Sequence, residues 1–329
     1  MRLFQVIGVA AALSCAASAG AGEIVDATGR TIKVAEPVTR IVVAGPPAEV
    51  LLYAFAPDAM LGWVRKPSDK LLPLISPQAR ALPVVGGVTA QGDNPEVSGV
   101  LAAKPQLIID YGDTDARYVA PVKNTQERTG IPYALIDGSL GKAPQALRDL
   151  GTLTGRAARG EELAVYAEGM LARAKQAAAG KKPVKVFVVR SPDGATTAMK
   201  DTHAGDVYDL AGLVNVAEYR EASPPLVAMW DPDVIVTLEP KFMEAAKGAA
   251  WADVRAIKEG RVVSVPRPAW GFTDHPPSVN RLIGVLWLTS QFYGAPRAAE
   301  LRVEAKKFHK MFFRVDLTEE QVTAMLAGG

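Results

Sequence analysis

The sequence contains few of the side chains that build metal and disulfide sites: one cysteine and three histidines in 329 residues. Cys15 lies close to the N-terminus, so the chain beyond it has no thiol and can form no disulfide. His203, His275 and His309 do not have the spacing of a zinc site. We therefore predict no metal site of the protein's own and no resident cofactor.

The common catalytic motifs are also missing. The sequence contains no G-x-S-x-G, no H-E-x-x-H, no P-loop and no dinucleotide-binding G-x-G-x-x-G. No nucleophile is paired with a base, so nothing in the sequence argues for an enzyme. A binding protein, which needs no reacting group, fits this absence.

Neither sign of charge is in large excess. The formal net charge is +2, from 37 Lys and Arg against 35 Asp and Glu, and the basic residues are scattered. A chain without a basic patch has no surface suited to a polyanion, so we expect no nucleic acid partner. After the N-terminal segment there is also no apolar run of about 18 residues, the length that a membrane helix needs. We expect the mature chain to be exported and soluble.

The N-terminal segment "MRLFQVIGVAAALSCAASAGAGE" has the features of a secretory signal peptide. One arginine precedes a short apolar stretch, and small residues follow it. The triplets at 17–19 and 19–21 both fit the A-x-A cleavage rule. We predict a signal peptide at 1–21 and a periplasmic location. Ala12 stands where a lipoprotein signal has a large aliphatic residue, which argues against a lipid anchor at Cys15.

The remaining chain has the composition of a globular protein with a large core. It is 49% apolar and 22% charged, and its length suits about two domains. Short β-branched runs such as "RIVVAG" (40–45) and "VKVFVVR" (184–190) alternate with helical stretches, among them 203–213 and 276–294. This alternation is typical of parallel sheets covered by helices on both faces.

One segment interrupts the alternation. Residues 144–182 are dense in Ala, Leu, Glu, Lys and Arg and predict a long helix, able to cross from one lobe to another. We therefore predict an α/β fold of two Rossmann-like lobes with parallel sheets, joined by one long rigid helix. The predicted boundaries are 22–155 for the N-terminal lobe, 156–181 for the interlobe helix and 182–329 for the C-terminal lobe.

One sequence pattern occurs twice, in "NPEVSGVLAAKPQLIIDYGD" (94–113) and in "SPPLVAMWDPDVIVTLEP" (223–240). Each copy has an apolar segment, then a charged residue and a proline (Lys104-Pro105 and Asp231-Pro232), then a β-branched run and an acidic loop. We infer that each lobe repeats one unit of helix and strand.

Aromatic and charged residues follow the predicted strands. In open α/β sheets, ligands bind beyond the carboxyl ends of the strands, and aromatic walls with a few charges suit a medium-sized ligand with anionic groups. The candidate ligand-binding residues are Trp63, Arg65, Tyr111, Arg190, Glu239, Arg267, Trp270 and His275. The proline-containing helix starts at 45–47 and 276–278 could also favour an anion.

Five segments together resemble the periplasmic binding proteins of ABC importers for iron-siderophores, heme and cobalamin. They are "DATGRTIKVAEPVTRIVVAG" (26–45), "VVGGVTAQGDNPEVSGVLAAKPQLII" (84–109), "LVAMWDPDVIV" (226–236), "WADVRAIKEGRVVSVP" (251–266) and "DHPPSVNRLIGVLWLTSQFYG" (274–294). The resemblance covers nearly the whole mature chain in order. The last segment also resembles the molybdate and tungstate branch of the family.

The resemblance implies that each lobe presents a glutamate to arginines of the membrane permease. In the N-terminal lobe this position is Glu96. The C-terminal lobe has Ser223-Pro224-Pro225 where the second glutamate is expected, and the nearest acid is Glu221. The second docking contact is thus displaced or absent.

These observations favour a monomeric periplasmic receptor that captures a metal complex, a ferric siderophore in the first place, and delivers it to an ABC permease and its ATPase. Heme, a corrinoid, and molybdate or tungstate remain open as ligands. The alternative, from another class of protein, is a chelatase-like periplasmic enzyme. Such an enzyme would need an acid and a histidine together, and Asp274-His275 is the one local pair of this kind.

Overall fold

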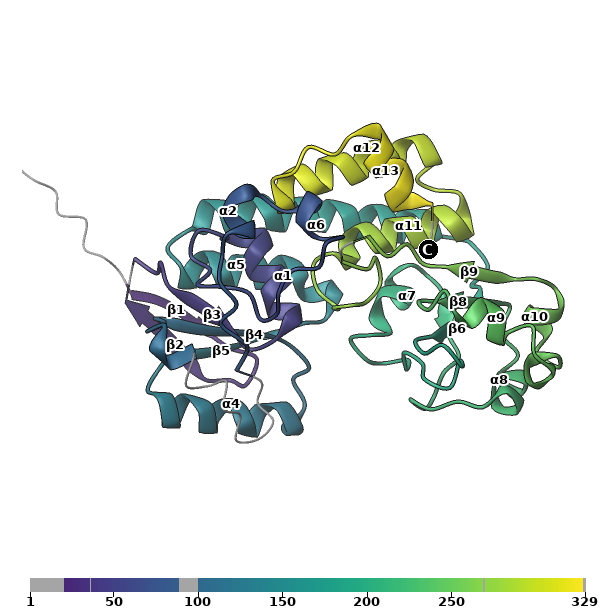
Figure 1. The fold of residues 1–329 in the computed structure, drawn as a ribbon, viewed down its shortest axis with the longest axis horizontal. Helices are drawn as coiled ribbons and strands as arrows, with labels where there is room; N and C mark the ends of the chain where they lie inside the picture. The colour runs from purple at the N-terminus through teal and green to yellow at the C-terminus, as the bar shows by residue number, and fades with distance from the viewer. Residues whose placement is uncertain (1–20, 36, 89–99, 269, 328–329) are drawn as a thin grey trace, which may run out of the picture.

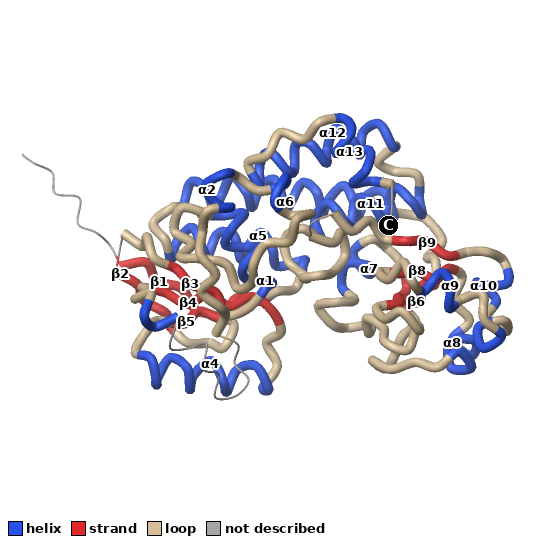
Figure 2. Tube along the Cα trace, in the orientation of Figure 1, coloured by secondary structure: helices blue, strands red, loops and turns tan. Residues whose placement is uncertain are grey.

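The computed structural model describes residues 21–35, 37–88, 100–268 and 270–327. Figure 1 shows two α/β lobes side by side, with helices running along one side of both. Figure 2 shows the strands at the centre of each lobe and helices around them. The predicted two-lobed α/β fold is confirmed. The predicted signal peptide lies outside the described residues, except for Ala21, where the first strand begins.

The N-terminal lobe is built on a parallel sheet of order β3-β4-β5, and a separate hairpin pairs β1 with β2. Side chains of β4 alternate between two cores: Ile109 packs on the side of α1 and α5, and Ile108 on the side of α4. The bounds are β1 Ala21–Val25, β2 Thr31–Ala35, β3 Ile41–Val43, α1 Pro46–Phe55, η1 Leu72–Leu74, α2 Pro77–Arg80, β4 Leu107–Gly112, α4 Ala116–Thr129, β5 Tyr133–Asp137, η2 Leu140–Lys142 and α5 Ala143–Leu153.

The C-terminal lobe has a parallel sheet of order β7-β6-β8-β9. The larger core covers one face of this sheet, where α7 and α11 lie, and a smaller core around Phe187 and Phe242 covers the other. The bounds are β6 Lys185–Val189, α7 Asp206–Leu210, β7 Val214–Asn215, α8 Pro224–Trp230, β8 Val234–Thr237, α9 Phe242–Ala245, η3 Ala249–Trp251, α10 Arg255–Lys258, β9 Val262–Ser264 and α11 Arg281–Tyr293.

The repeated sequence pattern is one structural unit in both lobes. Lys104 and Asp231 each follow helical residues, adopt positive φ angles of 48° and 46°, and precede a proline and an internal strand. A left-handed residue ends a helix, and the following proline then favours extended backbone. The pattern is therefore a helix stop and strand start, used once in each sheet.

The long helix predicted at 156–181 is observed as α6, Ala157–Ala178, with 22 residues. At 1.5 Å per residue it is about 33 Å long. It packs against α5 of the N-terminal lobe and against α11 of the C-terminal lobe, as Figure 1 shows. Gly160 permits the close approach to α5, because a Cβ there would lie 2.7 Å from the carbonyl oxygen of Leu147.

The chain after α11 forms a second connection between the lobes. It contains α12 (Ala298–Phe308), the π-helical turn η4 (His309–Phe313) and α13 (Glu319–Leu326). The hydroxyl of Tyr53 on α1 donates to the carbonyl oxygen of Phe313 over 3.1 Å. The guanidinium of Arg314 donates to the carbonyl oxygens of Tyr53, Ala54 and Phe55, which have no partners inside α1. The predicted C-terminal lobe at 182–329 thus includes residues that pack on the N-terminal lobe.

Three local expectations differ from the structure. The helix expected over 203–213 is limited to α7, and the helix expected from 276 begins as α11 at Arg281. The segment before Arg65 forms isolated bridges only, from Met60 to Ile41 and from Trp63 to Val84.

Candidate functional site

Two adjoining cavities lie between the lobes. The inner cavity has a volume of about 360 Å³ and is lined mainly by the N-terminal lobe. The outer cavity has a volume of about 880 Å³ and is lined mainly by the C-terminal lobe. Together they are called the cleft here. Four residues line both cavities: Asp113, Tyr118, His203 and Pro277.

The N-terminal lobe contributes the ends of its three parallel strands to the cleft. Gly45 follows β3, Asp113 follows β4 and Gly138 follows β5. The carboxyl ends of parallel strands meet at one edge of the sheet, which is where open α/β sheets bind ligands. Gly45 is also the residue before α1, whose first turn contains Pro46 and Pro47 and so offers fewer backbone N–H groups than an ordinary helix start.

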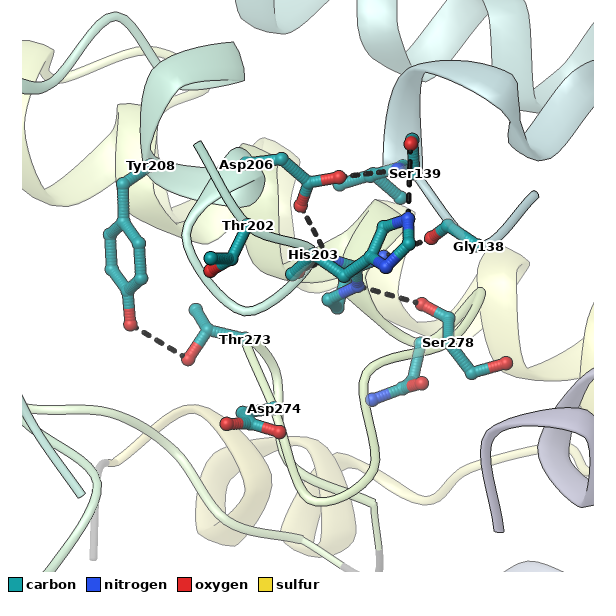
Figure 3. Close-up of polar contacts among 12 residues, drawn as sticks. Gly138, Ser139, Thr202, His203, Asp206, Tyr208, Thr273, Asp274 and Ser278 are labelled. Carbon is teal, nitrogen blue, oxygen red and sulfur yellow. Dashed lines mark hydrogen bonds and ion pairs between the residues drawn. The ribbon is translucent and has the colours of Figure 1, made fainter. Parts of the chain in front are cut away.

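His203 connects the two lobes at the boundary between the cavities. Its imidazole, from the C-terminal lobe, forms an ion pair with Asp113 and lies 3.4 Å from Asp137, both of the N-terminal lobe. Its Nε2 is also 3.1 Å from the hydroxyl oxygen of Ser139, as Figure 3 shows. Burial alone would lower the pKa of His203, but the two carboxylates outweigh it and raise the pKa. The hydrogen bond from His203 lowers the pKa of Asp113.

A buried arginine makes a second contact between the lobes. Arg281, the first residue of α11, is fully buried. Its guanidinium donates to the carbonyl oxygen of Gly138 in the N-terminal lobe over 2.7 Å and forms an ion pair with Asp206 on α7. Asp206 in turn accepts a hydrogen bond of 2.6 Å from the backbone N–H of Leu140. Each charged group here has a partner, as a buried ion pair requires.

The arginine after β6 is held by a buried carboxylate. Arg190 lines the outer cavity, and its guanidinium lies 2.7 Å from Asp274, which is 1% exposed. The nearby hydroxyl of Tyr208 donates to Thr273 over 3.1 Å (Figure 3). Asp274 therefore fixes the position of Arg190 at the wall of the cavity.

A third carboxylate is buried at the end of β4. Asp110 lines the inner cavity, and its carboxylate accepts hydrogen bonds from the backbone N–H of Tyr111 at 2.9 Å and from the hydroxyl of Tyr133 at 3.0 Å. Burial raises the pKa of Asp110. The Tyr111 hydroxyl is itself buried and has no hydrogen-bond partner. The inner cavity is thus bordered by two desolvated polar groups.

Two of the eight predicted ligand-binding residues line the cleft. Tyr111 lines the inner cavity and Arg190 the outer one. Tyr111 lies near the end of β4 and Arg190 follows β6. These two positions stay candidate ligand contacts.

The two predicted wall tryptophans lie in the core. Trp63 is fully buried, and its indole N–H donates to the carbonyl oxygen of Ala79 over 2.8 Å. Trp270 packs against Phe313 and Tyr53, with ring centroids 4.6 and 5.5 Å apart. Both indoles are buried in the larger core and line neither cavity.

The four other predicted residues line neither cavity. Arg267 forms an ion pair of 2.8 Å with Glu239, beyond the edge strand β9. Arg65 is exposed on the N-terminal lobe. Burial lowers the pKa of His275, whose Nε2 is buried without a hydrogen-bond partner. These four residues are therefore not among those that line the cleft.

Of the two predicted docking residues, Glu96 lies outside the described residues. Glu221 is exposed just before α8, and its backbone pairs with Thr196. An exposed position is compatible with a contact to another protein, and both roles stay predictions.

Sequence reasoning missed His203, Asp113, Tyr118 and Arg281. A signal existed for Asp113, since the acidic loop after β4 was part of the repeated pattern. No local signal existed for His203, which lies in a loop, or for Arg281, which lies in a mainly apolar segment. His203 contacts Asp113 and Asp137, and Arg281 contacts Gly138, all in the other lobe.

A family model described as periplasmic binding protein matches residues 87–269, more than half of the chain. The chain belongs to the periplasmic binding protein family. It is a solute-binding protein of the kind that serves ABC importers, and this is a family of receptors, not of enzymes. No curated protein matches the sequence significantly.

Solved structures of periplasmic binding proteins have the same fold. An ABC transporter solute binding protein from Sulfurospirillum deleyianum is 25% identical with a TM-score of 0.80, over 92% of this chain and 98% of that one. The molybdate-bound protein MolA from Haemophilus influenzae is 18% identical with a TM-score of 0.70, over 90% and 99%. The heme-binding protein RhuT from Roseiflexus is 22% identical with a TM-score of 0.56, over 78% and 98%.

Two further features of this binding protein concern its described residues. None of its described helices is both long and apolar enough to cross a bilayer. Within the same part of the chain, no three acidic, histidine or cysteine side chains gather as a group that could hold a metal ion.

Proposed function

We propose that this periplasmic binding protein captures a metal complex in the cleft and delivers it to an ABC permease. A ferric siderophore is the first candidate for this complex. The cleft carries this proposal. Its cavities of about 360 and 880 Å³ have the size of sites for medium-sized organic ligands. A metal that arrives already chelated needs no protein cluster to hold it.

The outer cavity supports an anionic face on the ligand. Arg190 and Arg220 both line it, and Asp274 holds Arg190 in place. Arginine binds carboxylate and catecholate oxygens with two parallel N–H donors. Asp113, Asp115, Asp201 and Asp206 line the same cavity, so the ligand would also present hydrogen-bond donors or a compensating cation.

Molybdate is a second candidate, since MolA has the same fold and is bound to molybdate. The size of the cleft favours a larger ligand, because a water-sized group occupies only about 30 Å³ and a tetrahedral oxyanion a small multiple of that.

Delivery to the permease would use Glu96 and Glu221 of the receptor as the residues that contact the permease. The receptor would act as a monomer.

Calorimetry against a ferric siderophore, heme, cobalamin and molybdate tests the proposal. We expect one-to-one binding of the ferric complex at micromolar affinity or tighter, which is about 8 kcal/mol or more. Arg220→Gln should weaken binding about tenfold, a change of about 1.4 kcal/mol. Arg65→Gln is the matched control, since Arg65 lines neither cavity, and should bind as the wild type does. Binding of molybdate alone, or of none of the four, would overturn the assignment.

A further inference from the structure

The inner cavity is a separate compartment of the cleft. His203 and Asp113 line both cavities and form an ion pair with each other, so this pair stands between them. Tyr118 and Pro277 complete the shared boundary. The two cavities therefore meet at the His203–Asp113 pair.

The two compartments differ in chemistry. The lining of the inner cavity is mostly small and apolar: Ala44, Gly45, Pro46, Pro47, Leu135 and Gly138. Among its described lining residues none is an arginine or a lysine, whereas Arg190 and Arg220 line the outer cavity. The two arginines that could pair with an anion therefore lie at the outer cavity, whose lining also includes Asp113, Asp115, Asp201 and Asp206.

The charged groups at the inner cavity are two carboxylates and one imidazole. The carboxylate of Asp110 is buried and hydrogen-bonded to Tyr111 and Tyr133, and Asp113 is paired with His203. The imidazolium carries at most one positive charge against these two carboxylates and against Asp137, 3.4 Å from its Nε2. A further negative charge placed here would face like charges, which is unfavourable.

We infer that the inner cavity accepts an apolar arm of the transported ligand, aromatic or aliphatic and without negative charge, while the anionic part stays in the outer cavity. This inference rests on the proposed function, because it divides one ligand between the two compartments. Ligands of this receptor would thus be amphiphilic complexes.

Gly112 allows a direct test. It is the last residue of β4, lines the inner cavity and has no atom within 4 Å of the place where a Cβ would be. Gly112→Leu should therefore fill the cavity without displacing its neighbours. Gly141 also has open space at its Cβ position and lines neither cavity, so Gly141→Leu is the matched control.

The probes are benzyl alcohol, benzylamine and benzoate, which have similar size and differ in charge, titrated against the full mature chain by NMR. We expect benzyl alcohol and benzylamine to bind at about millimolar affinity and benzoate at least tenfold more weakly. Gly112→Leu should weaken the first two at least tenfold, and Gly141→Leu should leave them unchanged. Benzoate binding as tightly as benzyl alcohol, or binding unaffected by Gly112→Leu, would overturn the inference.

The probes also separate this inference from the proposed function. If the ferric complex fails to bind while benzyl alcohol binds in a Gly112-dependent way, the apolar compartment stands and the ligand assignment fails. If the ferric complex binds equally well to the wild type and to Gly112→Leu, the receptor function stands and the arm compartment is refuted.

Discussion

Glu49 is a buried acid whose ionisation should make the protein less stable at alkaline pH. It lies in the first turn of α1, is 9% exposed, and its carboxylate accepts a hydrogen bond from the backbone N–H of Val64. Burial raises the pKa of Glu49 from 4.5 to about 7, although this hydrogen bond and the charge of Arg65 oppose the change. The folded state therefore binds the proton more tightly than the unfolded chain does.

The sign and size of the effect follow from this difference. The favourable contribution of the protonated carboxyl is fully present below pH 4.5 and is lost as the pH rises to about 7. One pKa unit corresponds to about 1.4 kcal/mol, so the ionised carboxylate destabilises the folded state by roughly 3 kcal/mol at pH 8 and by under about 1 kcal/mol at pH 5. Glu49→Gln keeps an acceptor for Val64 and cannot ionise.

Urea unfolding at pH 5 and pH 8, followed by tryptophan fluorescence, measures this. Glu49→Gln should be roughly 3 kcal/mol more stable than the wild type at pH 8 and close to it at pH 5. Glu319→Gln is a control for which the opposite change in stability is expected. Ion pairs with Lys306 and Arg302 lower the pKa of Glu319, so removing its charge should destabilise the folded state. The reasoning is refuted if Glu49→Gln changes the stability equally at both pH values.

Further predictions concern packing, rigidity and docking. Trp270→Ala should lower the unfolding free energy by about 3 kcal/mol, because the ring is buried, and change ligand affinity little; unchanged stability would contradict its core position. Arg314→Ala should cost about 2 kcal/mol and lower the melting temperature, since it leaves carbonyls of α1 without donors; an unchanged melting temperature would speak against this cap. Scattering curves with and without ligand should nearly superimpose, because α6 and the Arg314 contact both link the lobes; large compaction would exclude a rigid connection. Glu96→Arg should leave ligand affinity unchanged and sharply reduce transport, more than Glu221→Arg does; normal transport would remove the docking role.

Periodicity made the fold predictable. Strands such as β4 and β8 are buried on both faces and appear in the sequence as β-branched runs, and α6 appears as a long stretch of helix formers. The repeated charged residue and proline predicted a shared unit, and Lys104 and Asp231 have the same backbone conformation. These features depend on neighbours within a few residues along the chain.

The site was predictable only in part. Tyr111 and Arg190, which the rule of strand ends predicted, line the two cavities, and their role as ligand contacts stays a prediction. The same rule also selected Trp63 and Trp270, because a large aromatic residue after a strand has the same appearance in sequence whether it packs in the core or faces a cleft. Burial depends on which helix covers the residue, and for Trp270 the covering groups are Tyr53 and Phe313.

The sequence alone determined the two sheets, the helix between them and the repeated unit in each lobe, since local pattern and backbone preference are enough for these. Only the tertiary structure decided which residues form the cleft. His203 meets Asp113 and Asp137, and Arg281 meets Gly138, across a boundary set by how α6 and the returning C-terminal segment hold the lobes. An ion pair between distant segments leaves no periodic trace in either of them, because its geometry is fixed by the packing of the whole molecule.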